Sequence, residues 1–148
     1  YLEIIMSITQ AMTTSFKVEL LQGVHSFGPT SPDTFKIALY SSVATLNADT
    51  TQYNPIDEVV GTGYTAGGAT LTISTSPTSS GTTAYISFGN PSWTSATFTA
   101  AGALIYNATE SNKSVAVLNF GGNKTVANGT FLVQFPSATA TTAIIRVA

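Results

Sequence analysis

The fold of this chain is constrained most by a series of short segments with strand character that follow one another from residue 33 onward. In the clearest of them, Phe35, Ile37 and Leu39 alternate with Lys36, Ala38 and Tyr40, a period of two that places each trio on one face of a strand. The full set of candidate strands covers residues 34–40, 58–60, 69–75, 83–88, 93–99, 103–106, 115–120, 130–135 and 143–147.

Turn signals separate these segments at short intervals. They are Gly67-Gly68, Ser79-Ser80-Gly81, Asn90-Pro91, Gly121-Gly122-Asn123 and Asn128-Gly129. Glycine and asparagine accept positive φ, and proline fixes φ, so each of these motifs favours a turn. A parallel α/β sheet would require a helix between strands. The pattern therefore predicts a mainly β protein, a single antiparallel β-sandwich or jelly roll of about eight strands.

One amphipathic helix is predicted before the strands, over residues 7–24. Ser7 and Gln10 fit a capping box, and Ile8, Met12, Phe16 and Leu20 follow at i+4 spacing. Gly23 is a suitable C-terminal stop. The expected organisation is an N-terminal arm over residues 1–6, this helix, and a β-sandwich over 33–148. With 148 residues, the helix and the sandwich are expected to form one globular unit.

The composition argues against catalysis. Charged residues make up 8% of the chain, whereas soluble domains average about 25%, and enzymes gather titratable groups in a cleft. Serine and threonine together account for 41 of 148 residues. Their hydroxyls suit the solvated faces of strands and the turns between them. We expect a β-rich protein that is not an enzyme and acts by contact.

The few candidate site residues are interpreted as structural. Asp57 and Glu58 are adjacent, so on an extended segment they point to opposite faces, which is unsuitable for sharing a proton; solvated charge at a strand start is expected. His25 follows the predicted helix, where an imidazolium would interact favourably with the helix dipole. The sequence assigns no catalytic residue, and the binding residues are left unknown.

The segment Gly61-Thr62-Gly63-Tyr64-Thr65-Ala66 has the letters of a dinucleotide fingerprint. That motif functions at a helix N-terminus, whereas the residues that follow, 70–73, have a strand pattern. We interpret its glycines as allowing a tight loop. No metal-binding motif is present either, and no cofactor, metal or small-molecule ligand is expected.

Charge and cysteine content restrict partners and location. The five cations Lys17, Lys36, Lys113, Lys124 and Arg146 are scattered, so no basic stripe for nucleic acid is expected. No apolar run approaches the roughly 20 residues of a membrane span, and residues 1–5 are too short for a signal peptide. The absence of cysteine fits assembly in a reducing cytoplasm.

Two further features allow alternatives. Four N-x-[ST] sequons occur, at Asn107, Asn112, Asn123 and Asn128; surface glycans are one reading, and chance in a chain rich in Ser and Thr is the other. Trp93, with exposed tyrosines, offers a surface on which a sugar could stack, although a lone tryptophan on a strand is also typical of a core.

Several segments resemble small structural proteins of tailed double-stranded-DNA bacteriophages. The likeness covers nearly everything from Met6 onward. It is carried by residues 12–25, 33–40, 61–68, 102–107, 134–136 and 143–148, in particular Gly102-Ala103-Leu104-Ile105-Tyr106-Asn107 and the terminal Ala143-Ile144-Ile145-Arg146-Val147-Ala148. It transfers no functional residue.

This resemblance implies a place in the virion, assembled in the cytoplasm of the host bacterium. The expected function is that of a capsid decoration or cement protein that binds across neighbouring shell subunits. Its expected partners are the major capsid protein and copies of itself. The alternative is a tail, fibre or baseplate component that binds host surface carbohydrate.

Overall fold

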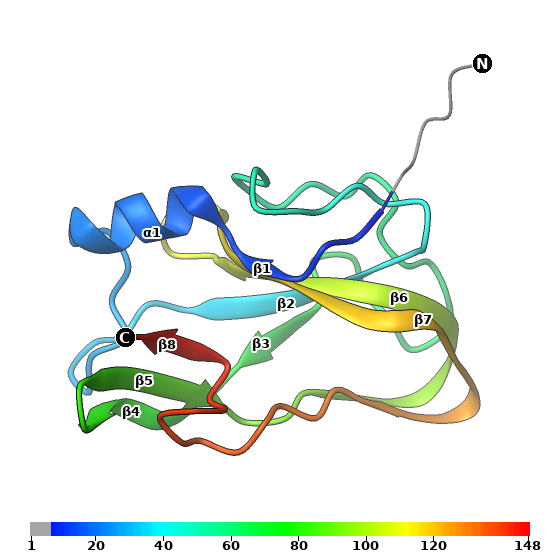
Figure 1. Ribbon diagram of the computed structural model, residues 1–148. Helices are drawn as coiled ribbons and strands as arrows, with labels where there is room; N and C mark the ends of the chain where they lie inside the picture. Colours follow the sequence, from blue (N-terminus) through cyan, green and yellow to red (C-terminus); the bar gives the residue numbers. More distant parts are fainter. Residues whose placement is uncertain (1–6) are drawn as a thin grey trace.

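The computed structural model describes residues 7–148, and the expected arm over residues 1–6 lies outside the described residues. The protein is mainly β, with two antiparallel sheets and one short helix (Figure 1). Its elements are β1 (Ala11–Met12), α1 (Thr14–Leu21), β2 (Phe35–Tyr40), β3 (Ala69–Leu71), β4 (Ile73–Ser80), β5 (Thr83–Phe88), β6 (Ser92–Asn107), β7 (Lys113–Leu132) and β8 (Ile145–Val147). The predicted fold class is confirmed. No described helix has the length and hydrophobicity to cross a membrane.

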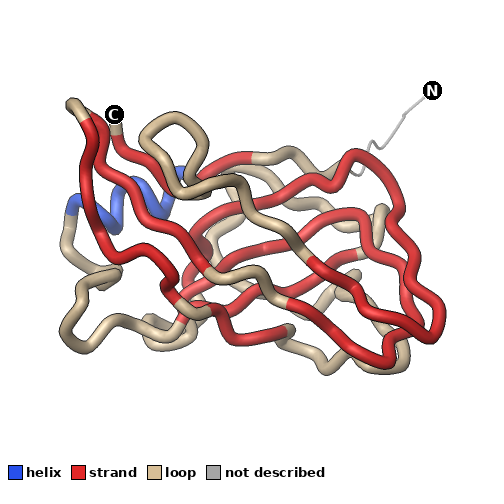
Figure 2. The backbone as a smooth tube through the Cα atoms, turned by 90° about the horizontal axis from the view of Figure 1, so that it is seen from below, coloured by secondary structure: helices blue, strands red, loops and turns tan. Residues whose placement is uncertain are grey.

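The two sheets form the layers of a sandwich. The larger has the strand order β1-β7-β6-β2-β3, and the smaller has the order β4-β5-β8. Apolar side chains from both sheets, with Phe16 from α1, form a core between them, which we call the inner core. Helix α1 lies at one end of the strands (Figure 2).

Strand β2 is buried on both faces. Phe35, Ile37 and Leu39 belong to the inner core, as the alternation predicts. Ala38 and Tyr40 join a second apolar cluster, the outer core, on the other face of the larger sheet. Leu46 covers this face from the connection between β2 and β3. The long connection over residues 41–68 is therefore part of the packed structure.

The prediction of a helix over residues 7–24 is wrong at its N-terminal half. Helix α1 begins at Thr14, and its N-cap is Thr13, whose hydroxyl accepts a hydrogen bond from the Phe16 N–H. Ser7 and Gln10 therefore form no capping box. The residues before Thr13 are extended: Ile8 bridges Leu46, and β1 pairs with β7.

Tertiary contacts explain this outcome. The extended chain places Ile8 in the outer core and Met12 against the inner core, so the i+4 spacing of these two residues does not mark one face. In that conformation β1 covers part of the edge of β7, whose backbone groups would otherwise lack partners. Ile8 then fills the outer core, while Phe16 fills the inner core from α1.

Four of the predicted strands merge into two. Residues 93–99 and 103–106 both lie in β6, and the strand predicted at 115–120 and the first part of that at 130–135 both lie in β7. The predicted turns at Gly121-Gly122-Asn123 and Asn128-Gly129 are therefore wrong. Gly121, Gly122 and Asn128 do have positive φ, but they form bulges: Ala101 of β6 lies opposite residues 120–123 of β7.

The remaining strands show smaller differences. Residues 69–75, predicted as one strand, are divided at Thr72, where the chain passes from β3 in the larger sheet to β4 in the smaller one. Residues 58–60 form only a bridge, between Glu58 and Tyr40. The predicted strand at 83–88 and the turn at Ser79-Ser80-Gly81 are confirmed by β5 and the β4–β5 hairpin.

Candidate functional site

The most concentrated polar site surrounds the buried side chain of Glu58, which is 8% exposed. Its Oε1 accepts hydrogen bonds from the Tyr64 hydroxyl at 2.6 Å and the Gly67 N–H at 2.7 Å. Its Oε2 accepts one from the Tyr53 hydroxyl at 2.6 Å. Both carboxylate oxygens are thus engaged by donors that come from its own connection, residues 41–68.

Further hydrogen bonds join this connection to the larger sheet. The Tyr64 hydroxyl also accepts from the Leu39 N–H of β2 at 2.9 Å. The hydroxyl of Tyr106, on β6, donates to the Gly67 carbonyl at 2.6 Å, and Tyr40 of β2 donates to the Asn54 carbonyl. We call Glu58 with Tyr40, Tyr53, Tyr64 and Tyr106 the Glu58 cluster. It holds the connection against β2 and β6.

Burial and the nearby carboxylate raise the pKa values of the four phenols above the usual value of 10. Burial, followed by the charge of Glu58, raises the pKa of Tyr106 to about 12 and raises that of Tyr40 still further. For Tyr53 and Tyr64, burial and then the hydrogen bond to Glu58 raise the pKa far above the usual 10. The hydroxyls of Tyr53 and Tyr64 donate to the Glu58 carboxylate, and those of Tyr40 and Tyr106 donate to backbone carbonyls.

The interpretation of Asp57 and Glu58 as solvated charge is wrong for Glu58. The sequence correctly separates the two side chains, since Glu58 lies inward and Asp57 takes no part in the cluster. Asp57 has a positive φ of 63°, a kink that turns the chain before Glu58. The one signal that could have identified the cluster is the set of tyrosines at positions 40, 53, 64 and 106 around a single carboxylate.

The raised tyrosine pKa values predict a loss of stability at alkaline pH. In the unfolded chain a tyrosine ionises near pH 10, whereas in the folded protein the pKa of Tyr106 is about 12 and those of Tyr40, Tyr53 and Tyr64 are raised further. Between these values the folded state binds more protons, so the unfolding free energy falls as pH rises, by up to about 1.4 kcal/mol per pH unit for each of the buried Tyr40 and Tyr106 and by less for the half-buried Tyr53 and Tyr64, which solvent partly screens. Urea unfolding across this range measures the decline; a constant free energy would contradict it.

A second buried polar network surrounds His25, which is 7% exposed. Asn107 Nδ2 donates to His25 Nδ1 at 3.0 Å, so the ring proton lies on Nε2, which donates to Glu19 at 2.7 Å. Asn107 Nδ2 also donates to Asp33, which accepts from the Ser26 N–H. The network joins α1, the following loop and the end of β6.

This geometry gives His25 a structural role. Hydrogen bonds with Glu19 and Asn107 fix the ring, whereas the sequence predicted an interaction with the helix dipole. Both ring nitrogens are occupied, so neither is placed to accept a proton from a hydroxyl nucleophile. The Asn107 side chain is fully buried, so this sequon offers no site for a glycan on the folded protein.

The fingerprint-like segment and Trp93 are also packed into the body of the protein. Gly61 packs against Thr97 and Phe98 of β6, and no helix follows it, so the loop interpretation of the fingerprint-like segment is confirmed. Trp93 is 6% exposed and lies among the aromatic rings of Tyr64, Phe98 and Phe131. The core interpretation of this tryptophan is confirmed.

Comparison with known proteins adds no relative: no model of a protein family, no curated protein and no solved structure matches the chain. Within residues 7–148, no three His, Asp or Glu side chains gather as metal ligands would. The described site is thus two hydrogen-bonded networks that attach loops to a β-sandwich.

Proposed function

We propose that this protein is a non-enzymatic structural component of a bacteriophage particle, a decoration or cement protein that binds across neighbouring shell subunits. The observation that carries the proposal is a loop that is held by buried hydrogen bonds and exposes apolar side chains. Ile56 and Val60 are 69% and 95% exposed, and they flank Glu58, whose carboxylate accepts three hydrogen bonds. A loop that is already ordered loses little conformational entropy on binding.

The surrounding surface supports the same role. The ribbon formed by the ends of β6 and β7 exposes threonines such as Thr97, Thr99 and Thr125, which can hydrogen-bond a partner without the desolvation cost of a charge. A weak contact at each subunit would be multiplied over a shell by avidity. The carbohydrate-binding alternative receives less support, because Trp93 is buried and four tyrosines are engaged in the Glu58 cluster.

Copy number in purified particles tests this proposal. Quantitative mass spectrometry after density-gradient separation is expected to find this chain at a copy number comparable to that of the major shell protein. A few copies per particle would place it in the tail or fibres, and absence from the particle would overturn the virion assignment.

A matched pair of variants tests the proposed surface. Val60→Asp is expected to abolish rebinding of the purified protein to particles that lack it, because a charge would be buried at the contact. Leu21→Asp places the same charge on α1, at a leucine that is 91% exposed, and is expected to leave rebinding unchanged. Equal loss in both variants would contradict the assignment to residues 56–60.

A further inference from the structure

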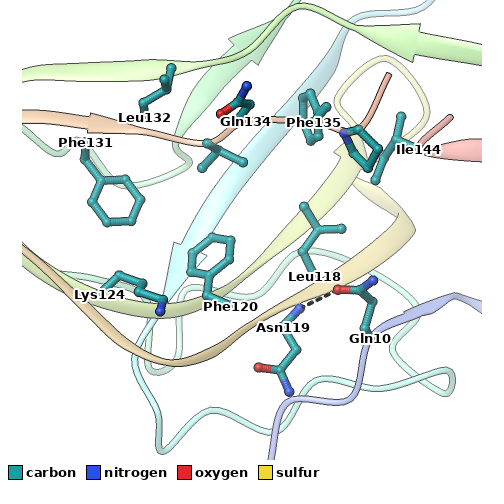
Figure 3. A pocket seen from close by; sticks show the side chains of 12 residues that line it. Gln10, Leu118, Asn119, Phe120, Lys124, Phe131, Leu132, Gln134, Phe135 and Ile144 are labelled. Carbon is teal, nitrogen blue, oxygen red and sulfur yellow. Dashed lines mark hydrogen bonds between the residues drawn. The ribbon is translucent and has the colours of Figure 1, made fainter. Parts of the chain in front are cut away.

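An apolar groove opens at one side of the sandwich. It has a volume of about 490 Å³, within the range of small-molecule sites, and lies between the middle of β7 and residues 131–136 (Figure 3). Its apolar lining consists of Leu118, Phe120, Phe131, Val133, Phe135 and Ile144. Most of these side chains belong to the inner core, so the groove is a place where the core reaches the surface. We call it the lateral groove.

The floor of the lateral groove is narrow. Leu118, Phe131 and Phe135 are each 8% exposed, and Val133 is 7% exposed, so solvent reaches only a thin strip of each side chain. The surface of a globular partner would rest on the rim, whereas a single alkyl chain can follow the floor along its length. Water in an apolar site of this kind finds few hydrogen-bond partners, which favours its displacement by an apolar ligand.

Backbone groups on both walls of the groove are already hydrogen-bonded within the chain. On β7, the Asn119 N–H donates to Oε1 of Gln10 (Figure 3), and the Asn119 side chain donates to the Ile8 carbonyl. On the opposite wall, the Val133 N–H donates to the Pro91 carbonyl. An added peptide strand would bury its own polar groups beside walls that are already paired, at a cost in free energy. The walls therefore favour a ligand whose buried part has no polar groups.

The charge of the lateral groove lies at one end. Lys124 is the one charged residue among those that line the groove, and no carboxylate lines it. Within residues 7–148 the one ion pair joins His25 and Glu19, so no acidic side chain of the described chain lies within ion-pair distance of Lys124. On β7, Lys124 follows Phe120, and Ile144 lies at the opposite end of the groove in Figure 3. The groove thus has a cationic end and an apolar remainder.

We propose that the lateral groove binds a free fatty acid, with its carboxylate beside Lys124 and its alkyl chain on the apolar floor toward Ile144. Charge complementarity selects the head group, and the narrow floor with its paired walls selects the chain. The sequence led us to expect no small-molecule ligand, because the lining residues are distant in sequence and only the fold brings them together. The inference is independent of the proposed place in a phage particle.

Titration with decanoate, below the concentration at which it forms micelles, tests the proposal. The ring centroids of Trp93 and Phe131 are 6.1 Å apart, so tryptophan fluorescence reports on the floor of the groove. Saturable binding of one decanoate per chain is expected. The affinity is expected to rise about two- to fourfold for each methylene group added between octanoate and dodecanoate, because each added group removes further apolar surface from water.

A matched pair of charge reversals isolates the contact with the carboxylate. Lys124→Glu is expected to weaken decanoate binding about three- to tenfold, because an attraction at an exposed site becomes a repulsion. Lys17→Glu makes the same change in net charge at an exposed lysine of α1, outside the groove, and is expected to leave the affinity unchanged. Decyltrimethylammonium, with a similar chain and the opposite charge, is expected to bind the natural protein more weakly than decanoate does.

Several results would overturn the proposal. They are the absence of saturable binding, equal decanoate affinity of the Lys124→Glu and Lys17→Glu variants, and equal affinity of the natural protein for decanoate and decyltrimethylammonium. Binding to phosphatidylglycerol vesicles without binding to monomeric decanoate would also overturn it, and would indicate a membrane contact in place of a free ligand. None of these results alters the copy number in particles, so a failure here leaves the proposed structural role standing.

Discussion

Replacing Glu58 with alanine is expected to lower the unfolding free energy by about 2–5 kcal/mol, because a buried donor left without its acceptor costs about 1–3 kcal/mol. The substitution leaves the hydroxyls of Tyr53 and Tyr64 and the Gly67 N–H without their acceptor. The carboxylate is 8% exposed, so water cannot fully replace it. A substitution in a connection between strands is therefore expected to affect the stability of the whole sandwich.

Two matched variants separate the hydrogen bonds from the charge. Glu58→Gln keeps the shape and one acceptor oxygen, and its cost is expected to lie between zero and that of alanine. Asp57→Asn removes the neighbouring charge, which is outside the cluster, and surface changes of this kind cost within about 0.5 kcal/mol. Urea unfolding followed by tryptophan fluorescence of Trp93 measures all three. Equal costs at positions 57 and 58 would contradict the structural role of the cluster.

The role of Glu58 shows where sequence reasoning ends for this chain. The alternation of side chains identified β2 and predicted the face formed by Phe35, Ile37 and Leu39, because a repeat of two residues is a local property of the chain. It did not predict that Tyr40 and Ala38 are also buried. That burial depends on the connection over residues 41–68 folding back over the outer face, which is decided by hydrogen bonds between residues distant in sequence.

The helix and the long strands show the same limit. The capping pattern at Ser7 is a sound local signal, but the open edge of β7 competes for the same residues, and tertiary pairing wins. Glycine and asparagine at positions 121, 122 and 128 do adopt positive φ, as their residue types suggest. Positive φ serves a bulge as well as a turn, and only the partner strand β6 distinguishes the two outcomes.

Gly68 is the position at which a single added methyl group is expected to be most damaging. Its φ is +75°, and a Cβ there would lie 2.8 Å from the Ala38 Cα and closer still to the Ile37 carbonyl oxygen. Both are backbone atoms of the buried strand β2, so neither can move aside easily. Overpacking costs about 1–3 kcal/mol or more, and a left-handed conformation adds about 1–2 kcal/mol. Gly68→Ala is therefore expected to cost about 3–5 kcal/mol.

Gly81 provides the control that separates these two effects. It has a similar φ of +59° in the β4–β5 hairpin, but a Cβ there meets no atom within 4 Å. Gly81→Ala is therefore expected to cost only the conformational part, about 1–2 kcal/mol. The difference between the two variants, measured by urea unfolding, gives the cost of the close approach to β2. Gly67 is hydrogen-bonded to both Glu58 and Tyr106, so a displacement at Gly68 also disturbs the Glu58 cluster. Equal costs for Gly68→Ala and Gly81→Ala would show that the connection packs loosely on β2.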